Sequence, residues 1–114
     1  MSGEINLNAL LKTLSAQLAE DVYVFVTLPD SAVPENIAAR MVFQEAEGTT
    51  LILRKTEAEA FSLDYEFPCR MITLNVHSSL EAVGFIARIA SELTKNDMGV
   101  NPVSGFFHDH LFVP

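Results

Sequence analysis

The 114-residue sequence predicts an α+β protein with mainly antiparallel sheets. Three observations lead to this fold class. Several runs are dense in β-branched and aromatic residues and are separated by Pro, Gly and Asp turn signals, as strands are. Two longer stretches show the three- and four-residue apolar spacing of an amphipathic helix. Hydrophobic residues make up 49% of the chain, enough for one compact domain or two very small modules sharing a core.

A helix and then a strand are predicted at the start of the chain. Leucines recur at three- and four-residue steps over residues 7–18, and Asn6 is placed to cap the first turn. The run DVYVFVTL, residues 21–28, is rich in β-branched and aromatic side chains and is closed by Pro29. A strand in the middle of a sheet is therefore expected there.

A hairpin is predicted next. After a loop or short helical turn over residues 31–39, two strand-like runs lie on either side of Glu47 and Gly48. Because glycine tolerates the positive φ that a tight turn demands, a hairpin over residues 40–53 is expected.

A short helix and a short strand follow in the predicted order. Thr56 and Glu59 have the spacing of a capping box, which is typical of a helix start. Residues 65–67 add one more short strand before Pro68.

The second half predicts a strand and a long helix. RMITLNV, residues 70–76, has strand composition, and Ser78 with Glu81 supplies a second capping box directly after it. Gly99 lies where the chain can turn out of the helix. The apolar residues that share one face of this helix are Val83, Ile86, Ala87, Ala90 and Leu93.

Two strands are predicted at the end, over residues 100–107 and 110–113, joined by a turn at His108 and Asp109. This turn would make Phe107 and His110 a cross-strand pair. The element order gives one βαββαβ, ferredoxin-like pattern and then the start of another. We therefore expect two tandem modules, residues 1–66 with the N-terminal helix and residues 67–114. The second is expected to lack its last helix and strand, or to have them replaced by the helix over residues 7–18.

The run EAVGFIARIASELTKNDMGVN, residues 81–101, resembles the core of an ACT domain. Such a domain has a glycine near the helix start, an apolar helix of four turns and a Gly-hydrophobic-Asn sequence before the next strand. Residues 65–114 as a whole resemble short bacterial tandem ACT-like proteins and, more distantly, the ACT modules of the eukaryotic cytosolic arginine sensor. The residues at the matching places are Gly84, Ile86, Ile89, Leu93, Gly99, Val100 and Asn101.

The resemblance implies a non-catalytic regulatory protein that binds an amino-acid-like ligand at a module interface, without a cofactor. One departure is that Val83 precedes Gly84 where many ACT domains have proline. A carboxylate could be received by the free N–H groups at the start of the helix, and Gly84 would let it come close. Equally, Ser78 and Glu81 could only cap the helix, and Gly84 could only permit close packing of the helix on the sheet. The expected ligand-binding residues are His77, Ser78, Ser79, Leu80, Glu81, Val83, Gly84 and Asn101.

Charge and composition exclude several classes of partner. A formal net charge of −8 would repel nucleic acid and anionic membranes. The start lacks a secretory segment and no apolar run reaches the roughly 18 residues of a membrane span, so a cytoplasmic location is expected. Cys69 is the only cysteine, so it is expected to be a buried apolar residue.

Two alternatives to the ligand-binding function stay open. If residues 106–113 formed one strand, His108 and His110 would share a face at zinc-ligand spacing, but they make only half a tetrahedral site and His77 is the only other histidine. A metal enzyme that depends on the histidines is therefore the weaker alternative, and no metal ligands are assigned. The stronger alternative is an assembly domain whose sheet edges pair with another chain. A homo-oligomer, a dimer, is expected under either function.

Overall fold

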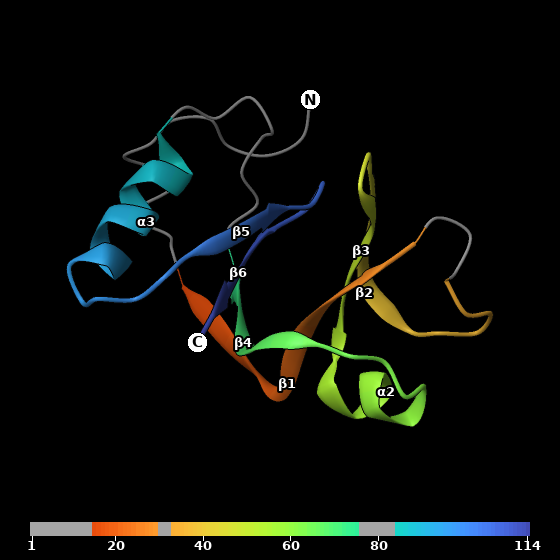
Figure 1. Cartoon of the computed structure of the whole chain (residues 1–114). Helices are drawn as coiled ribbons and strands as arrows, with labels where there is room; N and C mark the ends of the chain where they lie inside the picture. Colours follow the sequence, from red (N-terminus) through yellow and green to blue (C-terminus); the bar gives the residue numbers. More distant parts are fainter. Residues whose placement is uncertain (1–14, 30–32, 76–83) are drawn as a thin grey trace. The chain divides into compact units, whose positions relative to one another are not determined.

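The computed structural model describes residues 15–29, 33–75 and 84–114 (Figure 1). Hydrogen-bonded strand neighbours follow the order β2-β3-β1-β4-β6-β5. The α+β class and the antiparallel pairing are confirmed. The elements are β1 (Ala16–Leu28), β2 (Ala39–Glu45), β3 (Gly48–Arg54), α2 (Lys55–Ala60), β4 (Glu66–Leu74), α3 (Phe85–Thr94), β5 (Asn101–Ser104) and β6 (Asp109–Val113).

The chain divides into two compact units. The continuous unit is Glu20–Cys69, and the discontinuous unit combines Met1–Ala19 with Arg70–Pro114. The strands β1 and β4 each begin in one unit and end in the other. In the part of the chain that the structure describes, no helix is long and apolar enough to span a membrane.

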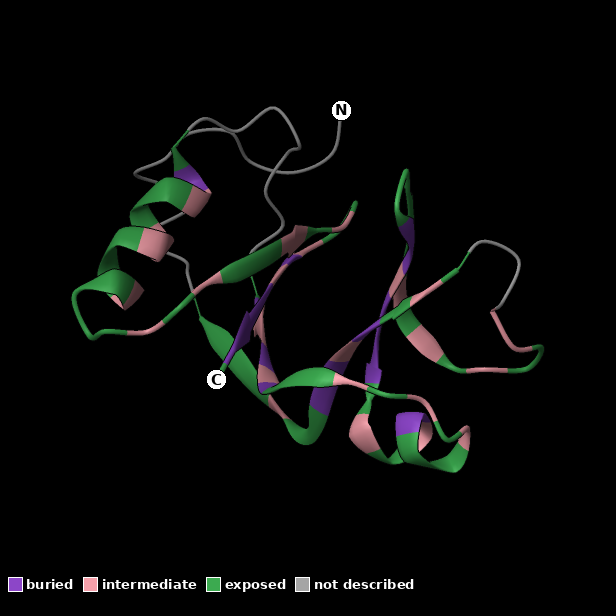
Figure 2. Cartoon of the chain, in the orientation of Figure 1, coloured by how far each residue is buried: buried purple, intermediate pink, exposed green. Residues whose placement is uncertain are grey.

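The continuous unit is built on β3. This strand pairs with β1 on one side and β2 on the other, so that Leu53 lies opposite both Val24 and Ala39. Its apolar side chains are buried, as the purple residues along β3 in Figure 2 show. The core cluster of this unit consists of Val24, Val26, Leu51, Leu53 and Ala58, the last from α2.

The β2–β3 hairpin confirms the predicted hairpin and gives the reason for its glycine. Gly48 begins β3, has φ of 151° and is buried. A Cβ at this position would lie 2.6 Å from the Leu28 carbonyl oxygen. The glycine is therefore required both by its backbone conformation and by the close approach of β1.

The discontinuous unit packs α3 against β4 and β6. Buried Phe85 at the start of the helix joins Leu74, Leu111 and Val113 in one cluster. Partly buried apolar residues of α3 and the segment after it surround this cluster, and these are Ile86, Ile89, Leu93, Met98 and Val100. Of the predicted apolar face, Ile86 and Leu93 pack in this way, Ala87 is exposed, and Val83 lies outside the described residues.

The start of β1 closes this second unit. The Asn75 amide donates to the Ser15 carbonyl at 2.8 Å, and Arg70 Nε donates to the Ala19 carbonyl at 2.8 Å. The start of β1 therefore lies beside β4. From the sequence, no closing strand was predicted for the second module. The prediction of a helix was wrong for residues 16–18, which are strand, while residues 7–14 lie outside the described part.

Three local predictions are corrected. Residues 65–67 and 70–76 were predicted as separate strands, but β4 runs through Pro68, with φ of 57° at Phe67 just before it. Phe67 packs edge-on against Phe25 at 5.6 Å, which holds the irregular segment to its neighbour. The helix α2 begins at Lys55, with Arg54 at the N-cap and no side-chain cap bond, so the capping box of Thr56 is wrong.

The third correction concerns the last turn. Gly105 N donates to the His108 carbonyl at 2.9 Å, which makes residues 105–108 the turn. Ser104 then pairs with Asp109, and Val103 pairs with His110. The predicted pairing of Phe107 with His110 was therefore wrong, because the turn begins earlier than the sequence suggested. Asp109 is not an exposed turn residue but is buried and accepts a hydrogen bond from Ser104 Oγ at 2.7 Å.

Candidate functional site

The predicted ligand site lies partly outside the described residues. Of its eight residues, His77, Ser78, Ser79, Leu80, Glu81 and Val83 fall in the range 76–83, of which the structure gives no description. Gly84 and Asn101 are described. These two residues mark the start of α3 and the start of β5.

Gly84 is the N-cap residue of α3, so this helix begins at Phe85 and the predicted start directly after Ser78 was wrong for Gly84. Ser78 and Glu81, the predicted capping box, lie outside the described residues.

Gly84 has φ of 84° and ψ of −5°, a left-handed conformation that side chains disfavour, and its carbonyl accepts from Arg88 N at 3.0 Å. Asn101 lies opposite Phe112, and its Nδ2 donates to the Phe112 carbonyl at 3.3 Å. The side-chain amide of Asn101 is therefore used within the sheet.

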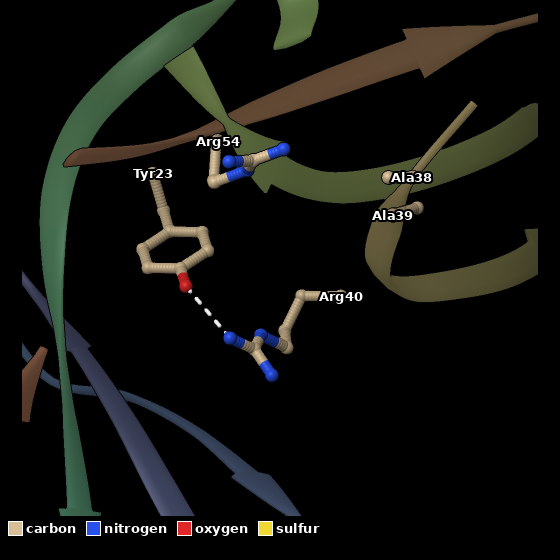
Figure 3. Close-up of a pocket in the computed structure, with 5 residues that line it drawn as sticks. All are labelled: Tyr23, Ala38, Ala39, Arg40 and Arg54. Atoms are coloured by element: carbon tan, nitrogen blue, oxygen red, sulfur yellow. Dashed lines mark hydrogen bonds between the residues drawn. The ribbon is translucent and has the colours of Figure 1, made fainter. Parts of the chain in front are cut away.

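A cavity of about 230 Å³ lies in the continuous unit and was missed by sequence reasoning. Tyr23 comes from β1, Arg40 from β2 and Arg54 from β3, as Figure 3 shows. The sequence contains only a faint signal for this cavity. Arg40 and Arg54 are two of the four arginines in the chain, and the hairpin register brings the start of β2 opposite the end of β3. The residues that line the cavity are Tyr23, Ala38, Ala39, Arg40 and Arg54.

Polar contacts fix the side chains around this cavity. Arg40 Nη2 donates to the Tyr23 hydroxyl at 2.9 Å, and the guanidinium lies 5.6 Å from the centre of the Tyr23 ring. Arg54 Nη2 is 4.0 Å from Glu57 Oε1, while Glu57 Oε2 accepts from the Ala38 amide at 2.9 Å. Two cations therefore line the cavity, and an anchored carboxylate lies beside one of them, Arg54.

The two C-terminal histidines have ordinary structural contacts. His110 Nδ1 lies 3.0 Å from Thr73 Oγ1 on the neighbouring strand. The rings of His108 and His110 are 6.4 Å apart and steeply inclined. Among the residues described, no group of three His, Cys, Asp or Glu side chains could hold a metal ion.

The single cysteine is buried, and its thiol Sγ donates to the Tyr23 carbonyl at 3.3 Å. Desolvation by burial raises the pKa of the Cys69 thiol from 9.0 to about 11. This environment is that of a structural cysteine, since thiolate nucleophiles have lowered pKa values.

Cys69 is therefore expected to react slowly in the folded protein. At pH 8 a pKa of about 11 leaves about 100-fold less thiolate than the ordinary value, and burial slows access further. The measurement is the rate of reaction with an aromatic disulfide reagent, with and without 6 M guanidinium chloride. Equal rates in the two conditions would contradict the burial.

The same pKa shift predicts a loss of stability at alkaline pH. Below pH 9.0 the thiol is protonated in both states, so it adds no pH dependence. Between pH 9.0 and about 11 the unfolded chain loses the proton first, so the free energy of unfolding falls as pH rises. Cys69→Ala should remove this part of the pH dependence in urea unfolding curves.

Comparison with known proteins identifies the fold. An ACT domain family model matches residues 2–70, and a second ACT domain model matches residues 66–114. No curated protein matches the chain.

Three solved structures are similar to this chain. A Vibrio cholerae protein of unknown function, VC0802, described as a possible transport protein, is 35% identical with a TM-score of 0.83, over 94% of this chain and 83% of that one. Protein Atu0741 from Agrobacterium tumefaciens is 16% identical with a TM-score of 0.68, over 88% of this chain and 77% of that one.

The third structure is that of aspartokinase alpha and beta subunits, at 12% identity and a TM-score of 0.61, over 86% of this chain and 85% of that one. The two structures of low identity support the fold alone. The two ACT matches together take up residues 2–114, which accounts for the tandem of ferredoxin-like modules. The chain belongs to the ACT domain family.

Proposed function

We propose that this protein is a non-catalytic regulatory module that binds a small amino-acid-like ligand beside the turn leading into α3. The family supports this proposal, because ACT domains are typically regulatory modules that bind small molecules and ACT matches cover residues 2–114. The proposed ligand contacts are those predicted from the sequence: His77, Ser78, Ser79, Leu80, Glu81, Val83, Gly84 and Asn101.

The observation that carries the proposal is the left-handed Gly84 at the start of α3. The first backbone N–H groups of a helix have no intrahelical partners, and the helix end carries a partial positive charge. Here the residue in front of them has no side chain. A ligand carboxylate can therefore approach the N–H groups more closely than it could past any other residue.

This helix end cannot hold a ligand alone. The helix dipole contributes about 0.3–1 kcal/mol, whereas micromolar binding needs about 8 kcal/mol. Other contacts must supply the difference, including an acceptor for the ligand ammonium group. We propose that a second copy of the chain supplies them in a homodimer.

The test is a thermal unfolding panel of the twenty amino acids with wild-type protein and Gly84→Asn. One or two amino acids should raise the Tm of the wild type, because a ligand at 100 times its Kd stabilises the native state by about 2.7 kcal/mol. Asparagine tolerates the left-handed conformation but adds a side chain, so Gly84→Asn should fold and lose the response.

Gly99→Ala is the control for this panel, because a Cβ there meets none of the described residues within 4 Å. Its response to the amino acids should equal that of the wild type. A flat wild-type panel, or a full response in Gly84→Asn, would contradict the proposed site.

Exposed apolar side chains support an assembly domain as the second candidate function. On the edge strand β2, Val42 is 54% exposed and Phe43 is 61% exposed. Edge strands of this kind are templates for pairing with another chain. If the amino-acid panel is flat and the mass in light scattering rises with concentration, this function is favoured. Phe43→Lys should then restore the monomer.

A further inference from the structure

We propose that the cavity between Tyr23, Arg40 and Arg54 binds the carboxylate of a small organic monoanion. All the residues of this site lie in the continuous unit, whereas Gly84 and α3 belong to the discontinuous unit. The inference therefore goes beyond the function proposed above and does not depend on it.

Arg40 is held in position before any ligand arrives. Its Nη2 donates to the Tyr23 hydroxyl at 2.9 Å, and the Tyr23 ring lies under its guanidinium at 5.6 Å. Tyr23 itself is 1% exposed, so its ring gives a fixed support. A guanidinium that is already oriented loses less side-chain entropy when it binds a carboxylate.

Arg54 brings a second guanidinium to the same cavity. It lies directly opposite Tyr23 in the β1–β3 register, and Figure 3 shows both side chains facing the space bordered by Arg40. Arg40 and Arg54 thus bring two of the four arginines of a chain of net charge −8 to one cavity. Arginine is suited to carboxylates because its planar fork can donate two parallel hydrogen bonds.

The charges around the cavity favour a ligand with a single negative charge. Glu57 lies 4.0 Å from Arg54 and offsets part of its charge, and it is anchored by the Ala38 amide. Among the described residues, no carboxylate forms an ion pair with Arg40. Two cations and one nearby anion leave about one positive charge for the ligand to neutralise.

The size and walls of the cavity favour a small organic anion. A volume of about 230 Å³ is smaller than the 300–1,000 Å³ of typical ligand pockets. The methyl groups of Ala38 and Ala39 and the ring of Tyr23 provide apolar surface beside the guanidinium groups. A short carbon chain can contact this surface, whereas an inorganic oxyanion cannot use it.

The first experiment is an NMR titration of the wild-type protein with propionate, using ¹H–¹⁵N spectra. Saturable shifts of the Ala38 and Ala39 amides are expected, because both residues line the cavity. The same titration is repeated with chloride and with inorganic phosphate at equal ionic strength. Tighter binding of phosphate than of propionate would overturn the assignment to a carboxylate, and shifts of equal size with chloride would overturn the site.

The second experiment repeats the titration with variants. Arg40→Gln and Arg54→Gln should each weaken propionate binding roughly tenfold or more, since each removes one charged donor group. Arg88→Gln is the matched control, because Arg88 is an exposed arginine of α3 in the other unit. Equal weakening in Arg88→Gln, or no saturable shift in the wild type, would overturn the proposal.

Gly84→Asn separates this site from the proposed amino-acid site. It should bind propionate as the wild type does, even where it has lost its response to amino acids. Loss of propionate binding in Gly84→Asn would contradict the independence of the two sites.

Discussion

Leu53→Ala is expected to lower the free energy of unfolding by about 2–5 kcal/mol. Leu53 is 0% exposed and lies in the central strand of the continuous unit, opposite Val24 on one side and Ala39 on the other. Removing its side chain both loses buried apolar surface and leaves a cavity, because the neighbouring strands cannot close on it. Since domains are stable by only about 5–15 kcal/mol, this is a large part of the total.

The measurement is urea unfolding followed by circular dichroism. Leu18→Ala is the matched control, because Leu18 is the same residue type but is 54% exposed. Its effect should stay within about 0.5 kcal/mol. Equal losses in Leu53→Ala and Leu18→Ala would mean that β3 is not the centre of the core.

Gly48→Ala is expected to cost about 2 kcal/mol or more, although it adds only one methyl group. The new Cβ would lie 2.6 Å from the carbonyl oxygen of Leu28, a backbone atom that cannot turn aside as a side chain can. Gly48 also has φ of 151°, which L-residues rarely adopt. Either the hairpin or the β1–β3 pairing must shift.

Gly99→Ala is the control for this substitution as well. In the part of the chain that the structure describes, nothing lies within 4 Å of a Cβ at Gly99, so the Tm of Gly99→Ala should stay close to that of the wild type. A Tm of Gly48→Ala equal to that of Gly99→Ala would contradict the close approach of the two strands.

Much of the fold could be predicted from local patterns. The strand over residues 21–28, the hairpin around Gly48 and the apolar face of α3 depend on neighbours within a few residues, which the sequence displays directly. The extended start of β1 could not be predicted in this way. Its partners, Arg70 and Asn75, are more than 50 residues away, and pairing with them decides the conformation in spite of the leucine spacing.

The candidate sites were predictable to different degrees. Glycine at the entry to α3 was recognisable, because its place relative to the apolar helix matches the family pattern. The cavity of Tyr23, Arg40 and Arg54 was not, because it depends on the register of three strands and on how far each side chain reaches. Nor did any pattern show that Asp109 would be buried against Ser104, since a shift of the turn by a few residues decides it.

The passage of β1 and β4 through both units has a consequence for the gene. The polypeptide leaves the discontinuous unit after Ala19 and returns to it at Arg70, so the coding sequence of the discontinuous unit is interrupted by that of the continuous unit. A deletion or recombination event that preserves folding would have to move the block of codons 20–69 as a whole. Swapping the two halves of the gene between relatives would instead divide both compact units.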